Sequence, residues 1–228
     1  MNNPICFALD GMGATAAQYH VDMLEEHVGA FKVGLELFIR SGKLPATQRP
    51  IVLDLKLHDI PETVAGAVRA GGDLGAKYMT LHIQQRETLE KAVQAAEPYG
   101  ITLLGVTVLT SMTRDDFKDL RFQDGAFDDV RSRVHNLARF AVARCGLRGL
   151  VCSPQEVEFL RMNFTDEEQP FLLVPGIRPA GSALNDQKRV GTPAQAMKDG
   201  ANLLVIGRPI RDANDPVQAA KDILAEIA

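Results

Sequence analysis

The sequence alternates between short apolar runs and longer amphipathic segments along almost its whole length. The apolar runs are nearly continuous, as expected of parallel strands that are buried on both faces. We expect strands over Ile5–Leu9, Phe31–Leu35, Ile51–Leu55, Tyr78–His82, Leu103–Leu109, Gly149–Val151, Phe171–Val174 and Leu203–Ile206. Between them the pattern predicts helices, among them Thr15–Val28, Pro61–Gly72, Thr88–Glu97, Val130–Cys145, Pro154–Met162 and Pro216–Ile227.

Eight strands that alternate with helices over 228 residues predict an α/β fold, a closed (β/α)8 TIM barrel that forms a single domain over residues 1–228. A doubly wound open sheet is the competing arrangement. The polar residues favour the barrel, because they lie at or just beyond strand ends, where barrels build their active sites. They are Asp10, Lys32, Asp54, Lys56, Thr110, Arg178 and Arg208. Two long connections, Thr110–Asp129 and Pro175–Gly191, have the length of lids or binding loops.

The composition narrows the class of ligand. Twenty-five Lys and Arg against 29 Asp and Glu give a net charge of −4, which does not favour a nucleic-acid or membrane surface. The three cysteines form no CxxC pair, and we see neither a signal peptide nor an apolar run of membrane-spanning length. We therefore expect a soluble cytoplasmic protein that meets any anionic ligand with local positive charge.

The segment Asp54-Leu55-Lys56-Leu57-His58-Asp59-Ile60-Pro61 is the most informative one. In a strand, Asp54 and Lys56 share a face, because side chains alternate. They would project together into the barrel mouth, and Asp59 follows in the turn. Ionisable groups at the end of an apolar strand are costly to bury unless they are paired. This segment alone also fits a structural ion pair that caps the strand.

A second lysine favours a functional array. Lys32 ends the neighbouring strand and would point into the same mouth as Asp54 and Lys56. Alternating cations and carboxylates keep each lysine charged and hold each group rigidly. On its own, Lys32 would more often be a rim residue whose ammonium group reaches water.

The last two strand ends indicate an anion site. Gly176 and Arg178 follow the seventh strand, and Gly207 and Arg208 follow the eighth, where barrels commonly bind phosphate. Glycine lets backbone N–H groups approach an anion closely, and arginine supplies a bidentate partner. Gln187, in the loop between them, could reach over a ligand or be a solvated loop residue.

Other polar residues leave alternatives open. Asp10 could accept hydrogen bonds from ribose hydroxyls or cap the turn after the first strand. Thr110 and Ser111 offer hydroxyl groups after the fifth strand. His58 and His82 are interpreted as orienting or packing residues, because neither has a carboxylate nearby at metal-ligand spacing.

These motifs together resemble the orotidine 5′-monophosphate decarboxylase family. The resemblance runs from Ala8-Leu9-Asp10 through Lys32-Val33-Gly34 and the Asp54–Pro61 segment to Val108-Leu109-Thr110-Ser111. It continues through Pro175-Gly176-Ile177-Arg178-Pro179 to Ile206-Gly207-Arg208-Pro209, in the family's order. The D-x-K-x-x-D core is shared with related barrels, whereas Lys32 and the His-Asp-Ile-Pro continuation make the resemblance specific.

The resemblance implies a decarboxylase of pyrimidine biosynthesis that turns orotidine 5′-monophosphate into uridine 5′-monophosphate and CO₂ without cofactor or metal. It implies a homodimer with shared active sites. It implies that Lys56 is the proton donor. It implies that Lys32, Asp54 and, from the other subunit, Asp59 complete the charged array, and that Asp10 and Thr63 contact the ribose. It also implies that Thr110, with Ser111 as the alternative, lies near the pyrimidine, and that Gln187, Gly207 and Arg208, with Arg178 nearby, hold the phosphate.

Two other functions compete with this interpretation. A related phosphosugar aldolase or epimerase would act through a metal-bound enediolate, and it would want an acidic or histidine ligand where Lys32 stands. A non-catalytic phosphate-binding module would have no reason to place Lys32 beside Asp54 and Lys56.

Overall fold

The computed structural model describes residues 3–112, 115–116, 130–179 and 190–227 of the chain. Its parallel strands close into a barrel in the order β1-β2-β3-β4-β5-β6-β7-β8, with β8 paired back to β1. The strands are β1 Ile5–Ala8, β2 Ala30–Gly34, β3 Ile51–Leu57, β4 Tyr78–His82, β5 Thr102–Val106, β6 Gly149–Val151, β7 Phe171–Val174 and β8 Leu203–Ile206. The closed barrel was predicted and is confirmed, and the open sheet is excluded.

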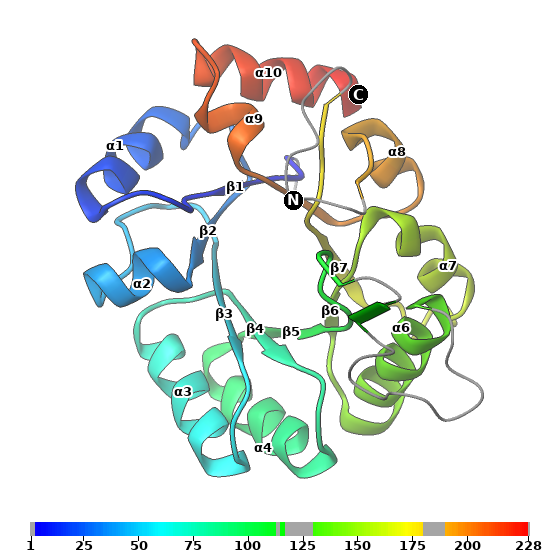
Figure 1. Cartoon of the computed structure of the whole chain (residues 1–228). Helices are drawn as coiled ribbons and strands as arrows, with labels where there is room; N and C mark the ends of the chain where they lie inside the picture. Colours follow the sequence, from blue (N-terminus) through cyan, green and yellow to red (C-terminus); the bar gives the residue numbers. More distant parts are fainter. Residues whose placement is uncertain (1–2, 113–114, 117–129, 180–189, 228) are drawn as a thin grey trace.

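Helices form an outer ring around the strands (Figure 1). The α-helices are α1 Ala14–Leu24, α2 Leu35–Ser41, α3 Pro61–Asp73, α4 Arg86–Ala96, α6 Val130–Arg139, α7 Val157–Met162, α8 Pro193–Lys198, α9 Arg208–Arg211 and α10 Pro216–Ile227. A π-helical turn, Phe140–Arg144, extends α6, and short 3₁₀ turns cover Glu97–Tyr99 and Pro154–Glu156. No helix in the described ranges is long and apolar enough to cross a membrane.

Alternation of side chains along the strands divides the core in two. The larger cluster packs between strands and helices, with Phe7, Phe31 and Leu53 fully buried in it. The smaller cluster fills the barrel interior with residues such as Cys6, Ala30, Val52, Tyr78 and Leu173. Since side chains alternate, the residues two positions further along each strand also face the interior. The smaller cluster, called the apolar plug below, therefore lies directly beneath the next layer of inward-facing side chains.

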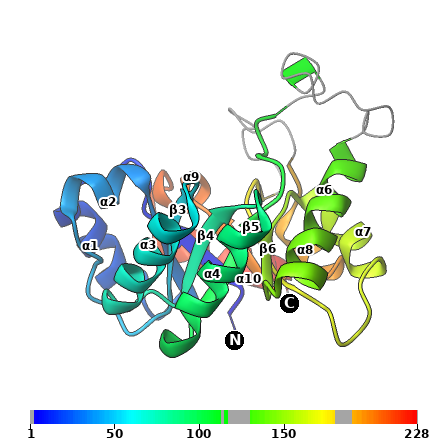
Figure 2. The same ribbon diagram turned by 90° about the horizontal axis from the view of Figure 1, so that it is seen from below.

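The two ends of the barrel differ. The two ends of the described chain lie at one end of the barrel, and residues 107–112, which follow β5, extend from the other (Figure 2). That second end carries the carboxyl ends of the strands, and it is where the polar residues singled out from the sequence lie.

Four of the predicted strands end at other residues: β1 ends at Ala8 rather than Leu9, and β3 continues to Leu57 rather than ending at Leu55. β2 ends at Gly34, and Leu35 begins α2 instead of closing the strand. β5 ends at Val106 rather than Leu109. Val108 and Leu109 line a cavity at the barrel mouth instead. Apolar residues that line a cavity give the same sequence pattern as apolar residues in a buried strand.

Candidate active site

The inward layer above the apolar plug is charged. Lys32 stands above Ala30 on β2, and Asp54 stands above Val52 on β3. Their side chains are only 7% and 11% exposed. Lys56 lies two residues further along β3. The sequence predicted that Lys56 would face the interior by simple alternation, but the strand is irregular at this point. The pairing of β3 with β4 shifts register between Leu53 and Leu57, and Lys56 has a φ of 48°.

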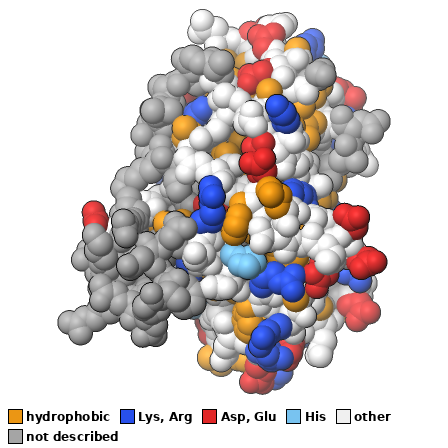
Figure 3. Space-filling model, turned by 90° about the vertical axis from the view of Figure 1, so that its right-hand side faces the viewer, with side chains coloured by type: hydrophobic (Ala, Val, Ile, Leu, Met, Phe, Trp, Pro, Cys, Tyr) orange, Lys and Arg blue, Asp and Glu red, His pale blue; other side chains and the backbone are white. Residues whose placement is uncertain are grey.

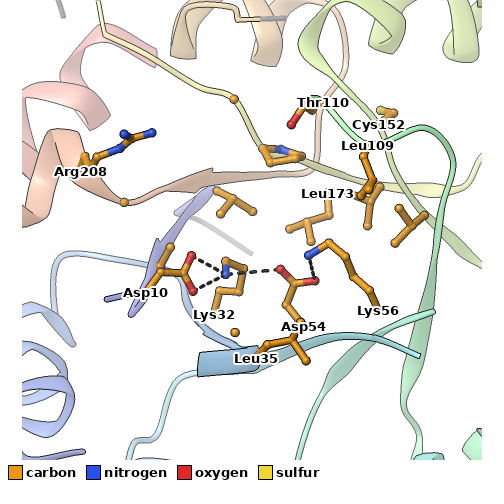
Figure 4. Close-up of a pocket in the computed structure, with 18 of the residues that line it drawn as sticks. Asp10, Lys32, Leu35, Asp54, Lys56, Leu109, Thr110, Cys152, Leu173 and Arg208 are labelled. Carbon is orange, nitrogen blue, oxygen red and sulfur yellow. Dashed lines mark hydrogen bonds and ion pairs between the residues drawn. The ribbon is translucent and has the colours of Figure 1, made fainter. Parts of the chain in front are cut away.

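Four side chains form a line of alternating charge across the barrel mouth (Figure 4). The Lys32 Nζ lies 2.8 Å from both carboxylate oxygens of Asp10 and 3.3 Å from Asp54 Oδ2. The other oxygen of Asp54, Oδ1, accepts a hydrogen bond of 2.8 Å from Lys56 Nζ. The array thus runs from Asp10 through Lys32 and Asp54 to Lys56, whose side chain is 31% exposed at the open end.

Mutual pairing keeps the buried members of this array charged. Burial alone would raise the pKa of Asp54, but the ammonium groups of Lys32 and Lys56 outweigh it and leave that pKa below its ordinary value. Burial alone would lower the pKa of Lys32, but the carboxylates of Asp54 and Asp10 leave it raised. Beneath them, burial raises the pKa of the Cys6 thiol, so a neutral group underlies the ions.

A cavity of about 600 Å³ opens above the array. One wall is apolar and comes from β7 and from the residues that follow β5 and β6, with Leu109, Cys152 and Leu173 among them (Figure 4). A volume of this size suits a small organic ligand. The wall can take a flat ring in van der Waals contact, and Lys56 lines the same cavity.

The rim formed after β7 and β8 is cationic. Gly176, Arg178, Gly207 and Arg208 all line the cavity there, as the sequence predicted for an anion site. Arg208 is the first residue of α9, and its guanidinium lies across the cavity from Asp54 and Lys56 (Figure 4). Arg178 is buried, and its Nη1 donates a 2.8 Å hydrogen bond to the carbonyl of Ile177. This rim can bind an anionic group such as a phosphate.

The remaining predicted residues divide into three groups. Thr110 lines the cavity, whereas its alternative, Ser111, is exposed and is not among the lining residues. Asp59 and Thr63 are exposed around the start of α3 and do not line the cavity of their own chain. Gln187 lies outside the described residues. The structure therefore brings Asp10, Lys32, Asp54, Lys56, Thr110, Gly176, Arg178, Gly207 and Arg208 together around one cavity.

The two histidines pack against each other. The rings of His58 and His82 have centroids 5.4 Å apart. Burial, followed by the charges of His58 and Lys56, lowers the pKa of His82. Within the described parts of the chain, no group of three His, Cys, Asp or Glu side chains could hold a metal ion.

Sequence reasoning missed three residues that support the array. Thr80, on β4, donates a 2.9 Å hydrogen bond to Asp54 Oδ1, and Arg211 donates one of 2.9 Å to the backbone carbonyl of Asp10. A Cβ atom at Gly34 would collide with the carboxylate of Asp10, so this position needs glycine. The only signal for Thr80 was a polar residue two positions after Tyr78 in an otherwise apolar run.

Comparisons with known proteins agree with this geometry. Residues 3–223 match the model of the orotidine 5′-phosphate decarboxylase / HUMPS family. The orotidine 5′-phosphate decarboxylase of Erythrobacter litoralis is 42% identical over the whole of both chains. That of Anaeromyxobacter sp. strain K is 44% identical over 97% of this chain and 96% of its own.

A solved structure extends the likeness to three dimensions. The crystal structure of orotidine 5′-phosphate decarboxylase from Lactobacillus acidophilus superposes with a TM-score of 0.81 at 30% identity, and the alignment covers 99% of each chain. The match spans the strands that carry the charged array and the loops that carry the cationic rim. The chain therefore belongs to the orotidine 5′-phosphate decarboxylase / HUMPS family.

Proposed function

We propose that this protein decarboxylates orotidine 5′-monophosphate at C6 to give uridine 5′-monophosphate and CO₂, with no cofactor. The observation that carries the proposal is the position of Lys56, whose ammonium group ends a rigid charged array beside an apolar wall and across the cavity from Arg208. The names of its relatives support the same reaction.

The chemistry explains why a fixed ammonium is needed. When the bond from C6 to the carboxylate breaks, its electron pair stays on C6 in an sp² orbital orthogonal to the ring π system, where it cannot delocalise as an enolate would. The Lys56 ammonium would stabilise this pair as it develops and then donate a proton to form the C6–H bond. The neutral amine that results would regain its proton from solvent.

Asp54 has a second task in this proposal. Its carboxylate stays ionised because Lys32 and Lys56 hold its pKa below the ordinary value. A substrate carboxylate bound near it would be repelled, and the repulsion would disappear when CO₂ leaves. Asp10, with both oxygens on Lys32, anchors the far end of the array and is our candidate for a ribose contact.

The remote parts of the nucleotide would supply the binding energy. Arg208, Arg178 and Gly207 would hold the phosphate, together with Gln187, while Thr110 would contact the pyrimidine. Because phosphate binding does not change during the reaction, its energy can serve to order the site around the ring.

We further propose a homodimer in which Asp59 and Thr63 serve the partner subunit's cavity. Both are exposed and do not line the cavity of their own chain, although they belong to the same segment as Lys56. Ile60, which follows Asp59 directly, is 64% exposed, and Ile39 on α2 is 77% exposed.

A spectrophotometric assay with orotidine 5′-monophosphate tests the proposed activity. We expect turnover that survives EDTA and disappears in Lys56→Ala. Turnover that EDTA abolishes would instead indicate metal-dependent chemistry, as in a related aldolase or epimerase. Binding of the nucleotide without turnover would indicate a phosphate-binding module.

A further inference from the structure

The backbone of Lys56 is unusual. It is the one residue other than glycine with a positive φ in the described parts of the chain. The left-handed region is unfavourable for a residue with a Cβ atom, so the surrounding structure must hold Lys56 there. The same place carries the register shift between β3 and β4, where regular ladder pairing is interrupted.

The hydroxyl group of Thr80 takes the place of the interrupted ladder. Thr80 is 1% exposed, and its Oγ1 accepts a 2.9 Å hydrogen bond from the backbone N–H of Lys56. The same hydroxyl donates a 2.9 Å hydrogen bond to Asp54 Oδ1, the oxygen that also accepts from Lys56 Nζ. Backbone, hydroxyl, carboxylate and ammonium thus form one closed ring of contacts.

We propose that Thr80 is a positioning residue that holds both ends of Lys56 in place for the proton transfer. It acts on the backbone through the N–H of Lys56 and on the ammonium through Asp54. A hydroxyl group has one proton, and donating it to Asp54 leaves the oxygen lone pairs for the N–H. The inference rests on the proposed function, because it assigns Thr80 to that reaction's chemical step.

Thr80→Val is the informative variant, because valine keeps the shape of threonine and removes the hydroxyl. The Lys56 N–H would lose its acceptor, Asp54 would lose a donor, and the ammonium would move. A displacement of about 1 Å can cost up to about 100-fold in rate, so we expect kcat to fall about 10- to 100-fold. KM should change less than about 3-fold, because the phosphate would be bound on the loops after β7 and β8.

Two further variants separate positioning from general stability. Thr80→Ser keeps the hydroxyl and should have a kcat within about 3-fold of the parent. Thr88→Val removes another fully buried hydroxyl, which lies on α4 away from the cavity and accepts a hydrogen bond from Gln85, the residue before the helix. It should lower the melting temperature as Thr80→Val does but leave kcat unchanged.

Crystal structures of the parent and Thr80→Val make the test independent of turnover. The proposal expects Lys56 to leave its positive φ, or its Nζ to leave Asp54, in the variant. If the parent does not turn over orotidine 5′-monophosphate, the proposed function fails, and the structures still report whether Thr80 positions Lys56. Unchanged geometry together with unchanged kcat would overturn the inference, as would an equal kcat loss in Thr80→Ser. If Thr80→Val does not fold, Thr80→Ala is compared with Thr80→Ser by the same criteria.

Discussion

The carboxylate of Asp54 links the stability of the protein to the integrity of its site. It accepts hydrogen bonds from Lys56 and Thr80 and is paired with Lys32. Removing one partner from such a buried set typically costs about 3–5 kcal/mol, because an uncompensated charge remains. The same contacts favour the ionised carboxylate, and acid should therefore destabilise the fold through this residue.

The pH dependence has a definite sign. The pKa of Asp54 is below its ordinary value of 3.8 in the folded protein, so the unfolded chain binds the proton more tightly. The stabilisation is fully present above the unfolded pKa and is lost as pH falls through the folded pKa. We expect the free energy of unfolding in urea to fall less steeply below about pH 5 in Asp54→Asn than in the parent.

The test compares the pH dependence of the free energy of unfolding, not its absolute value. The absolute value also changes in Asp54→Asn, because Lys32 and Lys56 lose their shared carboxylate. Glu158→Gln, which removes an exposed carboxylate on α7, is the control and should keep the parent slope. Identical acid slopes for all three proteins would mean that Asp54 is not the linked group.

At the same scale, Lys56 illustrates what the sequence could and could not predict. The sequence predicted correctly that Lys56 and Asp54 point into the same mouth, although β3 departs from simple alternation at Lys56. The positive φ and the register shift were not predictable, because the backbone there is bonded to a hydroxyl from β4, 24 residues further along the chain. A contact of this kind leaves no periodic signal in the strand that it distorts.

At the scale of elements, most strands and the periodic helices were predictable, whereas the shortest helices were not. The helix Pro216–Ile227 has the predicted bounds, and Asp215 caps it through a 2.9 Å bond from the backbone N–H of Gln218. In contrast, α9 has four residues, which is too short for a helical pattern to emerge. This short helix nevertheless begins with Arg208 and so directs that side chain into the cavity.

Arg208→Ala should separate phosphate binding from chemistry. Losing a close charge partner costs about 3 kcal/mol, so we expect KM for the nucleotide to rise roughly 100-fold. The phosphate-free nucleoside lacks the partner, and its kcat/KM should hardly change. Lys221→Ala, an exposed cation on α10, controls for the lost positive charge. Equal losses of kcat/KM for nucleotide and nucleoside would rule Arg208 out as the phosphate ligand.

At the scale of the whole molecule, charge is distributed unevenly. The net charge is −4, and acidic and basic side chains are interspersed over the face that carries α6, α7 and α8 (Figure 3). The cavity, in contrast, has an excess of positive charge, because among the described residues Lys32, Lys56, Arg178, Arg208 and Arg211 line it against only Asp10 and Asp54. The attraction for an anionic nucleotide is therefore local to the barrel mouth, and screening by salt should weaken it at long range.

The proposed shared site makes a demanding prediction about the assembled protein. If Asp59 serves the partner subunit, Lys56→Ala and Asp59→Ala should each be inactive alone but active when co-refolded. In a mixed dimer one site then collects both lesions and the other collects none. Random mixing makes half of the dimers mixed, so roughly a quarter of all sites should regain full activity, measured as turnover per chain.

A matched pair gives the control, because Lys56 and Asp54 lie in one cavity of one chain. Co-refolding Lys56→Ala with Asp54→Ala places one lesion in every site of the mixed dimer and should restore nothing. If activity recovers in the mixture with Asp59→Ala but not in the mixture with Asp54→Ala, then Asp59 is the residue that crosses the interface. If mixed dimers form, as shown by two differently tagged chains that copurify, and neither pair recovers, then Asp59 does not act in the partner subunit's site.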